Sequence, residues 1–253
     1  MIVSVPADFW ETLPLGEGIR LLNRDAHGLA AFDKPAGVLS HPNSSQDEAR
    51  SLLTSRYDQE AQCFHWKAAD GAVRRLWLLN RLDSATSGVI LTAASEALAL
   101  AVREHFARKQ VRKLYHALVF GRPLKGHDIW RDQLAVVKQG GQIRTAARGN
   151  IPAETVFQLL KHTQRTFSTS LVRLEPRTGR SHQLRVQCAK RQLPIIGDQT
   201  YGDFALNRAF KKATGLDRMF LHSVETAFTY DFAGRKNSFK AVAPLPREFG
   251  AGY

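Results

Sequence analysis

The chain has 253 residues, which is enough for one large domain or two small ones with a sizeable core. Its 36 Lys and Arg against 23 Asp and Glu leave a formal net charge of +13. Lysines and arginines that neutralise phosphates release condensed counterions, so this balance favours a polyanionic partner. The two cysteines lie far apart and the histidines lack metal-ligand spacing, so we expect neither a disulfide framework nor a metal site.

The N-terminus lacks the basic start and apolar core of a signal peptide, and no apolar run approaches the roughly 18 residues that span a bilayer. No phosphate-binding glycine loop is present, and we expect no cofactor. These features together predict a cytoplasmic enzyme that makes no membrane contact.

The first third of the chain predicts a buried strand at 28–32 and a Pro/Gly turn at 33–37. Ser44 with Asp47 three residues later resembles a capping box, so we expect a helix from about Ser45 to Tyr57. The segment 59–76 is typical of a solvated loop or hairpin with a few packed aromatics; the alternative is that Trp66, Lys67, Arg74 and Arg75 contact RNA.

A polar loop at 79–88 carries Arg81 and Asp83 and precedes an apolar strand, Val89 to Ala93. A helix should begin after Ser95 and end near Arg108, where acidic and basic residues complement its dipole. Residues 113–120 alternate as a strand that includes Tyr115; a plain core aromatic is the alternative reading of this residue.

Residues 121–150 indicate loops and a hairpin, with a flexible basic stretch at 140–149 that is either a solvated loop or a contact with RNA phosphates. Strands are expected at 153–160 and 166–174. Ser181 is a fair N-cap for a helix running to about Gln192, on which Cys188 is a small core residue. Alternating apolar residues at 226–232 predict another core strand, and residues 239–243 end the sheet.

Five motifs in order over residues 28–243 resemble those of the RluA-type RNA pseudouridine synthases. They are DKPAGVLSHP (33–42), NRLDSATSGVILTA (80–93), KLYHALV (113–119), RTGRSHQLRVQ (177–187) with its PIIGD and YG continuation, and MFLHS (219–223). The second and fourth are specific, and together they make the resemblance strong.

The resemblance implies that Asp83 is the catalytic aspartate, that Tyr115 stacks on the target base and that Arg185 pairs with Asp83. By the same resemblance, Arg81 would fill the gap left by a flipped-out uridine. Whether Asp83 forms a covalent adduct or acts as a base is left open. RNA contacts are further expected from the basic residues within and beside these motifs, namely Arg112, Lys113, Arg180 and His182.

Lys34 in the first motif has either a structural or a phosphate-facing role, and we counted it among the expected RNA contacts. Two positions depart from the family pattern: Asn80 and Gln187 each stand where histidine is usual. We expect the first departure to tune the loop rather than abolish activity.

The implied fold is α+β: a mixed, mostly antiparallel sheet with flanking helices and a central cleft. Residues 1–27 would be an extension packed on a catalytic domain at 28–253, too short for a separate RNA-binding module. The expected activity is isomerisation of a uridine in ribosomal RNA or tRNA by a monomer. The alternative is a non-catalytic RNA-binding protein with the same fold. A nuclease or glycosylase would predict metal-binding carboxylates or a released base, and the sequence shows no such carboxylate cluster.

Overall fold

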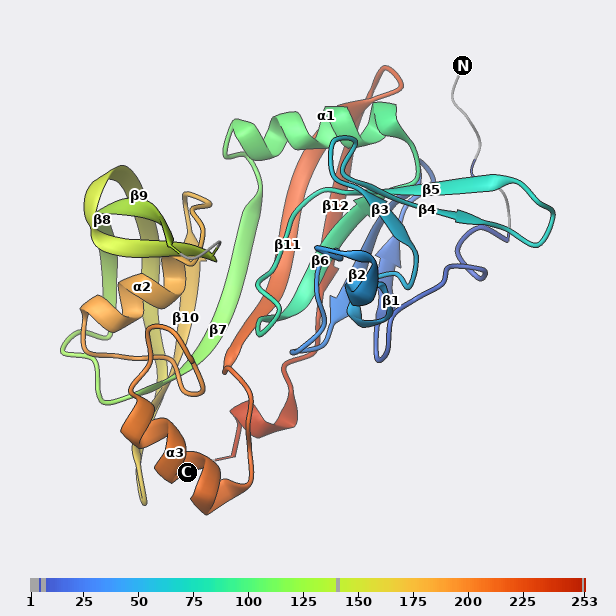
Figure 1. Ribbon diagram of the computed structural model, residues 1–253. Coiled ribbons are helices and arrows are strands. Elements are labelled where there is room, and N and C mark those ends of the chain that lie inside the picture. The colour runs from blue at the N-terminus through green and yellow to red at the C-terminus, as the bar shows by residue number, and fades with distance from the viewer. Residues whose placement is uncertain (1–4, 6–7, 140–141, 252) are drawn as a thin grey trace. The chain divides into compact units, whose positions relative to one another are not determined.

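The computed structural model describes residues 5, 8–139, 142–251 and 253. The chain forms two compact units, which we describe separately (Figure 1). The first unit combines residues 1–111 with 225–243, and the second combines 112–224 with 244–253. Strand β11 (Leu221–Phe232) runs from the second unit into the first.

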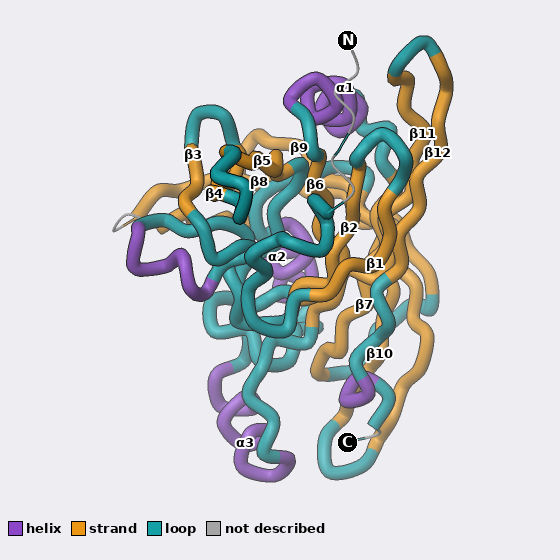
Figure 2. Tube along the Cα trace, turned by 90° about the vertical axis from the view of Figure 1, so that its right-hand side faces the viewer, coloured by secondary structure: helices purple, strands orange, loops and turns teal. Residues whose placement is uncertain are grey.

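The first unit is a sheet with one helix, α1 (Glu96–Ala107), on one of its faces. Strands β1, β2, β6 and β5 lie side by side in that order as antiparallel pairs: β1 with β2, β2 with β6, and β6 with β5. β3 and β4 continue the sheet beyond β5, and β12 pairs with β11 (Figure 2). Their bounds are β1 Arg20–Arg24, β2 Leu29–Lys34, β3 Arg56–Asp58, β4 Cys63–Lys67, β5 Val73–Leu78, β6 Ser87–Ala93 and β12 Arg235–Val242.

Strands β2 and β6 read as continuous apolar runs because both faces of the sheet are covered. Alternate residues of β6, Val89 and Leu91, join a core beneath α1, whereas Ile90 joins a core on the other face. The second core is closed by the N-terminal segment through Phe9 and Leu13. The expected strands at 28–32 and 89–93 and the helix after Ser95 are thus confirmed.

The second unit is built on four antiparallel strands in the order β7-β10-β9-β8. Helix α2 (Gln183–Lys190) packs on β9 and β8, and helix α3 (Phe204–Thr214) contributes Phe210 to an aromatic core with Phe120 and Phe220. The strand bounds are β7 Arg112–Phe120, β8 His127–Gln139, β9 Gln142–Gln164 and β10 Ser168–Pro176. No helix in the described ranges is long and apolar enough to cross a membrane.

The predicted helix from Ser45 to Tyr57 is wrong. Only a short 3₁₀ helix, Ser45–Arg50, forms, and Tyr57 lies in β3. The backbone after Arg50 is used in tertiary pairing instead: Leu52 N–H donates to Leu39 O at 2.9 Å, and Leu52 O accepts from Gly16 N–H at 2.9 Å. Such bonds cannot be read from a local capping pattern.

Three other predictions of local structure need correction or extension. The basic stretch, apart from residues 140 and 141 outside the described ranges, is part of β9 and pairs with β8 rather than forming a loop. Helix α2 begins after His182, not Ser181, and His182 has a left-handed backbone with φ of 53°. Helix α3 was not predicted, although Asp203 caps its start and Gly215 its end.

Candidate active-site residues

In the first unit, Asp83 lies on the loop between β5 and β6, and the first motif fixes that loop. Ser40 Oγ donates to Leu82 O at 2.7 Å and accepts from Leu82 N–H at 2.9 Å. Asp83 O in turn accepts from Thr86 N–H at 2.9 Å. Asp83 is partly exposed and Arg81 is exposed. The carboxylate therefore stands on a backbone held on both sides.

Lys34 is completely buried and serves the same loop. Its Nζ donates to the carbonyl oxygens of Pro35, Val38 and Ser84 at 3.0, 2.6 and 3.1 Å. Gly37, whose φ of 92° suits glycine, also donates its N–H to Ser84 O, at 2.8 Å. An ammonium enclosed in this way cannot reach a phosphate on the surface, so the expected RNA contact by Lys34 is wrong and its role is structural.

Asn80 ties the start of the loop to β6. Its Oδ1 accepts from Leu91 N–H at 2.7 Å, beside the backbone bond from Leu79 N–H to Leu91 O at 3.0 Å. An amide oxygen is a permanent acceptor here, whereas histidine would need one particular tautomer. The departure from the family pattern is therefore compatible with an ordered loop.

In the second unit, Tyr115 lies on β7 opposite Leu174 of β10 and is partly buried. Two residues earlier, the Lys113 ammonium lies beside Gly179, where an added Cβ would approach Nζ to 3.3 Å. Burial lowers the pKa of Lys113. The exposed Arg112 pairs with Glu175, with 3.3 Å between Nε and Oε2. The third and fourth motifs thus meet in space.

Arg185, on α2, is buried and forms a two-point ion pair with Asp198. Its Nε donates to Oδ2 at 2.8 Å and its Nη2 to Oδ1 at 2.7 Å. Burial raises the pKa of Asp198. The hydrogen bonds and charge of Arg185 and the backbone N–H groups of Tyr201 and Thr200 lower it by more, so the net shift is downward. The Tyr201 ring covers the guanidinium at 5.1 Å.

The two other residues expected from the fourth motif, Arg180 and His182, lie just before the start of α2. His182 Nδ1 is hydrogen-bonded to the Tyr201 hydroxyl at 2.9 Å. The Arg180 backbone N–H donates to Gln183 Oε1 at 3.2 Å, and its Nε donates to Pro152 O at 3.3 Å. These contacts hold the start of α2 against the β8–β9 hairpin.

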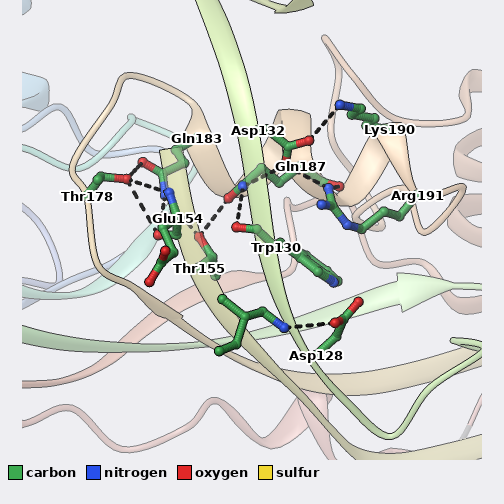
Figure 3. Close-up of polar contacts among 11 residues, drawn as sticks. Asp128, Trp130, Asp132, Glu154, Thr155, Thr178, Gln183, Gln187, Lys190 and Arg191 are labelled. Atoms are coloured by element: carbon green, nitrogen blue, oxygen red, sulfur yellow. Dashed lines mark hydrogen bonds and ion pairs between the residues drawn. The ribbon is translucent and has the colours of Figure 1, made fainter. Parts of the chain in front are cut away.

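Gln187 is the centre of a buried polar chain that joins α2 to β8 and β9 (Figure 3). Its Nε2 donates to the Asp132 carboxylate at 2.8 Å, and its Oε1 accepts from Thr155 Oγ1 at 2.6 Å. Asp132 also accepts from Lys190 Nζ at 2.6 Å and from Arg191 Nη1 at 2.9 Å. Burial raises the pKa of Asp132, yet these donors outweigh burial and the net shift is downward.

The chain continues from Thr155 toward the start of α2. Gln183 Nε2 donates to Thr155 Oγ1 at 2.9 Å, and Thr178 Oγ1 donates to Gln183 Oε1 at 2.7 Å. Neither Asp132 nor Asp198 was singled out from the sequence. Asp198 stands in the PIIGD motif, which was a usable signal, whereas nothing local marks Asp132.

The expected site residues fall into two groups, one in each unit: Arg81 and Asp83 in the first, and Arg112, Lys113, Tyr115, Arg180, His182 and Arg185 in the second. The pairing of Asp83 with Arg185 stays a prediction. Among the described residues, no group of three or more His, Cys, Asp or Glu side chains is arranged to hold a metal ion.

Comparison with known proteins identifies what these motifs belong to. The family model described as RNA pseudouridylate synthase matches residues 28–190. A Pasteurella multocida protein called tRNA pseudouridine synthase C is 34% identical over 84% of this chain and 86% of its own length. The Vibrio cholerae protein of the same name is 32% identical over 81% and 83%, respectively.

Solved structures show the same fold. Human RNA Pseudouridylate Synthase Domain Containing 4 superposes with a TM-score of 0.63 and 25% identity, covering 91% of this chain and 90% of that one. Human RNA Pseudouridylate Synthase Domain Containing 1 gives a TM-score of 0.68 over 90% and 84%, with 22% identity. The expected fold is confirmed, and the chain belongs to the RNA pseudouridylate synthase family, isomerases that act on RNA.

Proposed function

We propose that this chain converts a specific uridine of a tRNA into pseudouridine. Relatives that carry the name tRNA pseudouridine synthase C match more than four fifths of the chain at about 30% identity, which supports tRNA over ribosomal RNA as the substrate. The observation that carries the proposal is the Asp83 loop: a partly exposed carboxylate on a backbone fixed by Ser40 and Lys34.

The proposed reaction begins when the target uridine leaves the RNA stack, with Arg81 filling the gap and Tyr115 stacking on the extruded base. Asp83 then attacks the sugar or removes a ribose proton, and the bond between N1 and C1′ breaks. The base turns in the pocket and C5 bonds to C1′, which releases Asp83 from the sugar or, on the other route, is accompanied by return of the ribose proton. The hydrogen at C5 leaves as a proton and N1 gains one. Atoms balance without any co-reactant.

Arg185 would keep Asp83 ionised and oriented. A guanidinium presents two edges that can each bind a carboxylate, and the Nε–Nη2 edge of Arg185 binds Asp198. The proposed pairing with Asp83 uses the other edge. Arg112, Lys113, Arg180 and His182 are proposed to contact RNA near this residue; Lys34 is excluded by its burial.

We further propose that residues 1–27 are an extension of a catalytic domain at 28–253. This is supported by the pairing of β1 with β2 and by Phe9, Leu13 and Ile19, which share a core with Phe32. We also propose that the protein is a monomer in the cytoplasm; size-exclusion chromatography and cell fractionation test these two points.

Replacing the carboxylate tests the reaction directly. Asp83→Asn keeps the size of the side chain but removes the nucleophile or base, so release of tritium from [5-³H]uridine in unmodified tRNA should fall to the background rate. Affinity for tRNA should stay within a few-fold of wild type. Asp231→Asn, an exposed carboxylate on β11, is the matched control and should retain wild-type turnover.

Turnover by Asp83→Asn would refute the assignment. Tritium release by neither wild type nor Asp231→Asn, together with tight tRNA binding, would favour a non-catalytic RNA-binding protein. Mapping pseudouridines in tRNA and ribosomal RNA from a strain that lacks the protein would identify the modified position, and a missing site in ribosomal RNA alone would contradict the tRNA proposal.

A further inference from the structure

Three strands of the first unit place basic side chains in one straight row. Arg56 of β3 is directly opposite His65 of β4, and His65 is directly opposite Arg75 of β5. Residues directly opposite each other in antiparallel strands point to the same face of the sheet. Figures 1 and 2 show β3, β4 and β5 side by side at this place. The three side chains therefore form a cross-strand row.

The row lies on a face that the protein itself covers only in part. In the neighbouring row, Cys63 and Trp77 are buried in the core that α1 closes. Beyond that cover, Arg56 and Arg75 are exposed and His65 is partly exposed. The next pair along the strands, Lys67 opposite Val73, is also exposed, with Val73 at 64%. The surface thus continues as a basic strip with one apolar residue.

The two arginines of the row have no ion-pair partner among the described residues. They lie on one face of the sheet, two strands apart with His65 between them, so their like charges repel each other weakly. Arg74, the next residue of β5 on the other face, shows the contrast: its Nη2 lies 2.7 Å from Asp70 Oδ2. Repulsion between Arg56 and Arg75 therefore lowers the stability of the free protein slightly, and a bound anion would offset it.

Asp58, on β3 in the neighbouring row, is a nearby carboxylate whose pKa is affected by the row. Its pKa is lowered chiefly by the backbone N–H of Ala61, then by that of Glu60 and by the charges of His65 and Arg75. Its Oδ1 is hydrogen-bonded to those two backbone groups, at 2.9 Å to Glu60 N and 3.0 Å to Ala61 N. The Asp58 carboxylate is thus used in a turn, and the three positive charges of Arg56, Arg75 and Lys67 outnumber its single negative charge.

We propose that the row Arg56–His65–Arg75, extended by Lys67, binds the phosphodiester backbone of the tRNA substrate. This inference rests on the proposed function, to which it adds a contact surface away from the reacting base. Neighbouring strands are about 4.8 Å apart, so the row spans about 10 Å. That length covers roughly two or three successive phosphates of one nucleic-acid strand. Such contacts position the RNA without reading its sequence.

Neutralising the two arginines tests the proposal. Arg56→Gln, Arg75→Gln and the double variant would be titrated with unmodified tRNA by fluorescence anisotropy over a range of salt concentrations. Each substitution should weaken Kd about 5-fold at about 0.1 M salt and reduce the slope of log K against log salt by about 0.7–0.9. The losses should be the same for tRNAs of different sequence.

Two variants control for the loss of one positive charge. Arg74→Gln changes the same strand but the opposite face, and Arg235→Gln changes an exposed residue of β12; both should keep the wild-type salt slope. Because Arg56 and Arg75 repel each other across His65 in the free protein, Arg75→Gln should also raise the Tm slightly at low salt. A Tm that falls while affinity falls would indicate a folding defect and overturn the proposal.

If the double variant keeps the wild-type Kd and salt slope, the proposal that the row binds tRNA is wrong. The proposed function still holds in that case, provided that wild type forms pseudouridine in the same tRNA. If wild type forms none, the proposed function fails, and the row is then judged by the same variants titrated with a random RNA. Equal losses in Arg74→Gln would show a general charge effect and would also overturn the row.

Discussion

Lys34 shows how a buried charged residue can organise a neighbouring loop. Its ammonium satisfies three carbonyl oxygens, two from the turn of the first motif and one from Ser84, next to Asp83. Buried carbonyls left without donors cost free energy, because water cannot replace the lost partner. Lys34 therefore joins the first motif to the Asp83 loop, together with Ser40 and the Gly37 N–H.

Replacing Lys34 with methionine should expose this role. Lys34→Met preserves the length and apolar stem of the side chain but removes the donor shared by Pro35 O, Val38 O and Ser84 O, of which Ser84 O keeps the Gly37 N–H bond. The free energy of unfolding should therefore fall by about 2–4 kcal/mol. Urea denaturation followed by circular dichroism measures the change. Lys125→Met, at an exposed position, should cost little. Equal stability of the two variants would mean that the loop does not depend on the buried ammonium.

At the scale of elements, helix α2 is positioned by polar contacts as well as by packing. Leu184 and Val186 contribute apolar contacts, but the helix also carries Gln183 and Gln187, both buried and both bonded to strand residues. Gln187 donates to a carboxylate on one side and accepts from a hydroxyl on the other. A neutral histidine can do the same with its two ring nitrogens, so glutamine and histidine can make equivalent contacts at this position.

Replacing Gln187 with leucine and with histidine tests whether its two hydrogen bonds position α2. Gln187→Leu leaves Asp132 and Thr155 without their shared partner and should lower the free energy of unfolding by about 1–3 kcal/mol, with slower pseudouridine formation because α2 carries Arg185. Gln187→His should recover most of both losses at pH 8, where an unperturbed imidazole is neutral. Thermal unfolding and tritium release measure the two effects. If leucine and histidine behave alike, the polar chain does not position α2.

The elements also show what the sequence could and could not predict. Strands β2 and β6 and helix α1 were predicted because their own apolar patterns and caps determine them. The Ser45–Tyr57 helix failed because Leu52 finds backbone partners far away in the chain, which a local pattern does not record. The motifs located Asp83 and Arg185, whereas the partnership of Asp132 with Gln187 depends on a tertiary contact over 55 residues.

At the scale of the whole molecule, the first unit is assembled from two distant stretches of chain. Residues 225–243 supply Phe228, Tyr230 and Phe239 to the core beneath α1, and β11 and β12 lie in the same sheet as β6. Residues 1–111 alone would leave that core open on one side. Burial of large apolar side chains is the main favourable contribution to folding, so an open core should not hold its native packing.

A fragment of residues 1–111 should therefore lack a cooperative thermal transition and should bind ANS. Adding a synthetic peptide of residues 225–243 should restore cooperative unfolding in a concentration-dependent way, because binding stabilises only the folded form. A control peptide with Phe228→Ser and Phe239→Ser keeps the length and charge but cannot fill the core, and it should not restore folding. Cooperative unfolding of the fragment alone would show that the C-terminal strands are dispensable for this unit, and the two-segment core would then be a late addition to an independently stable sheet.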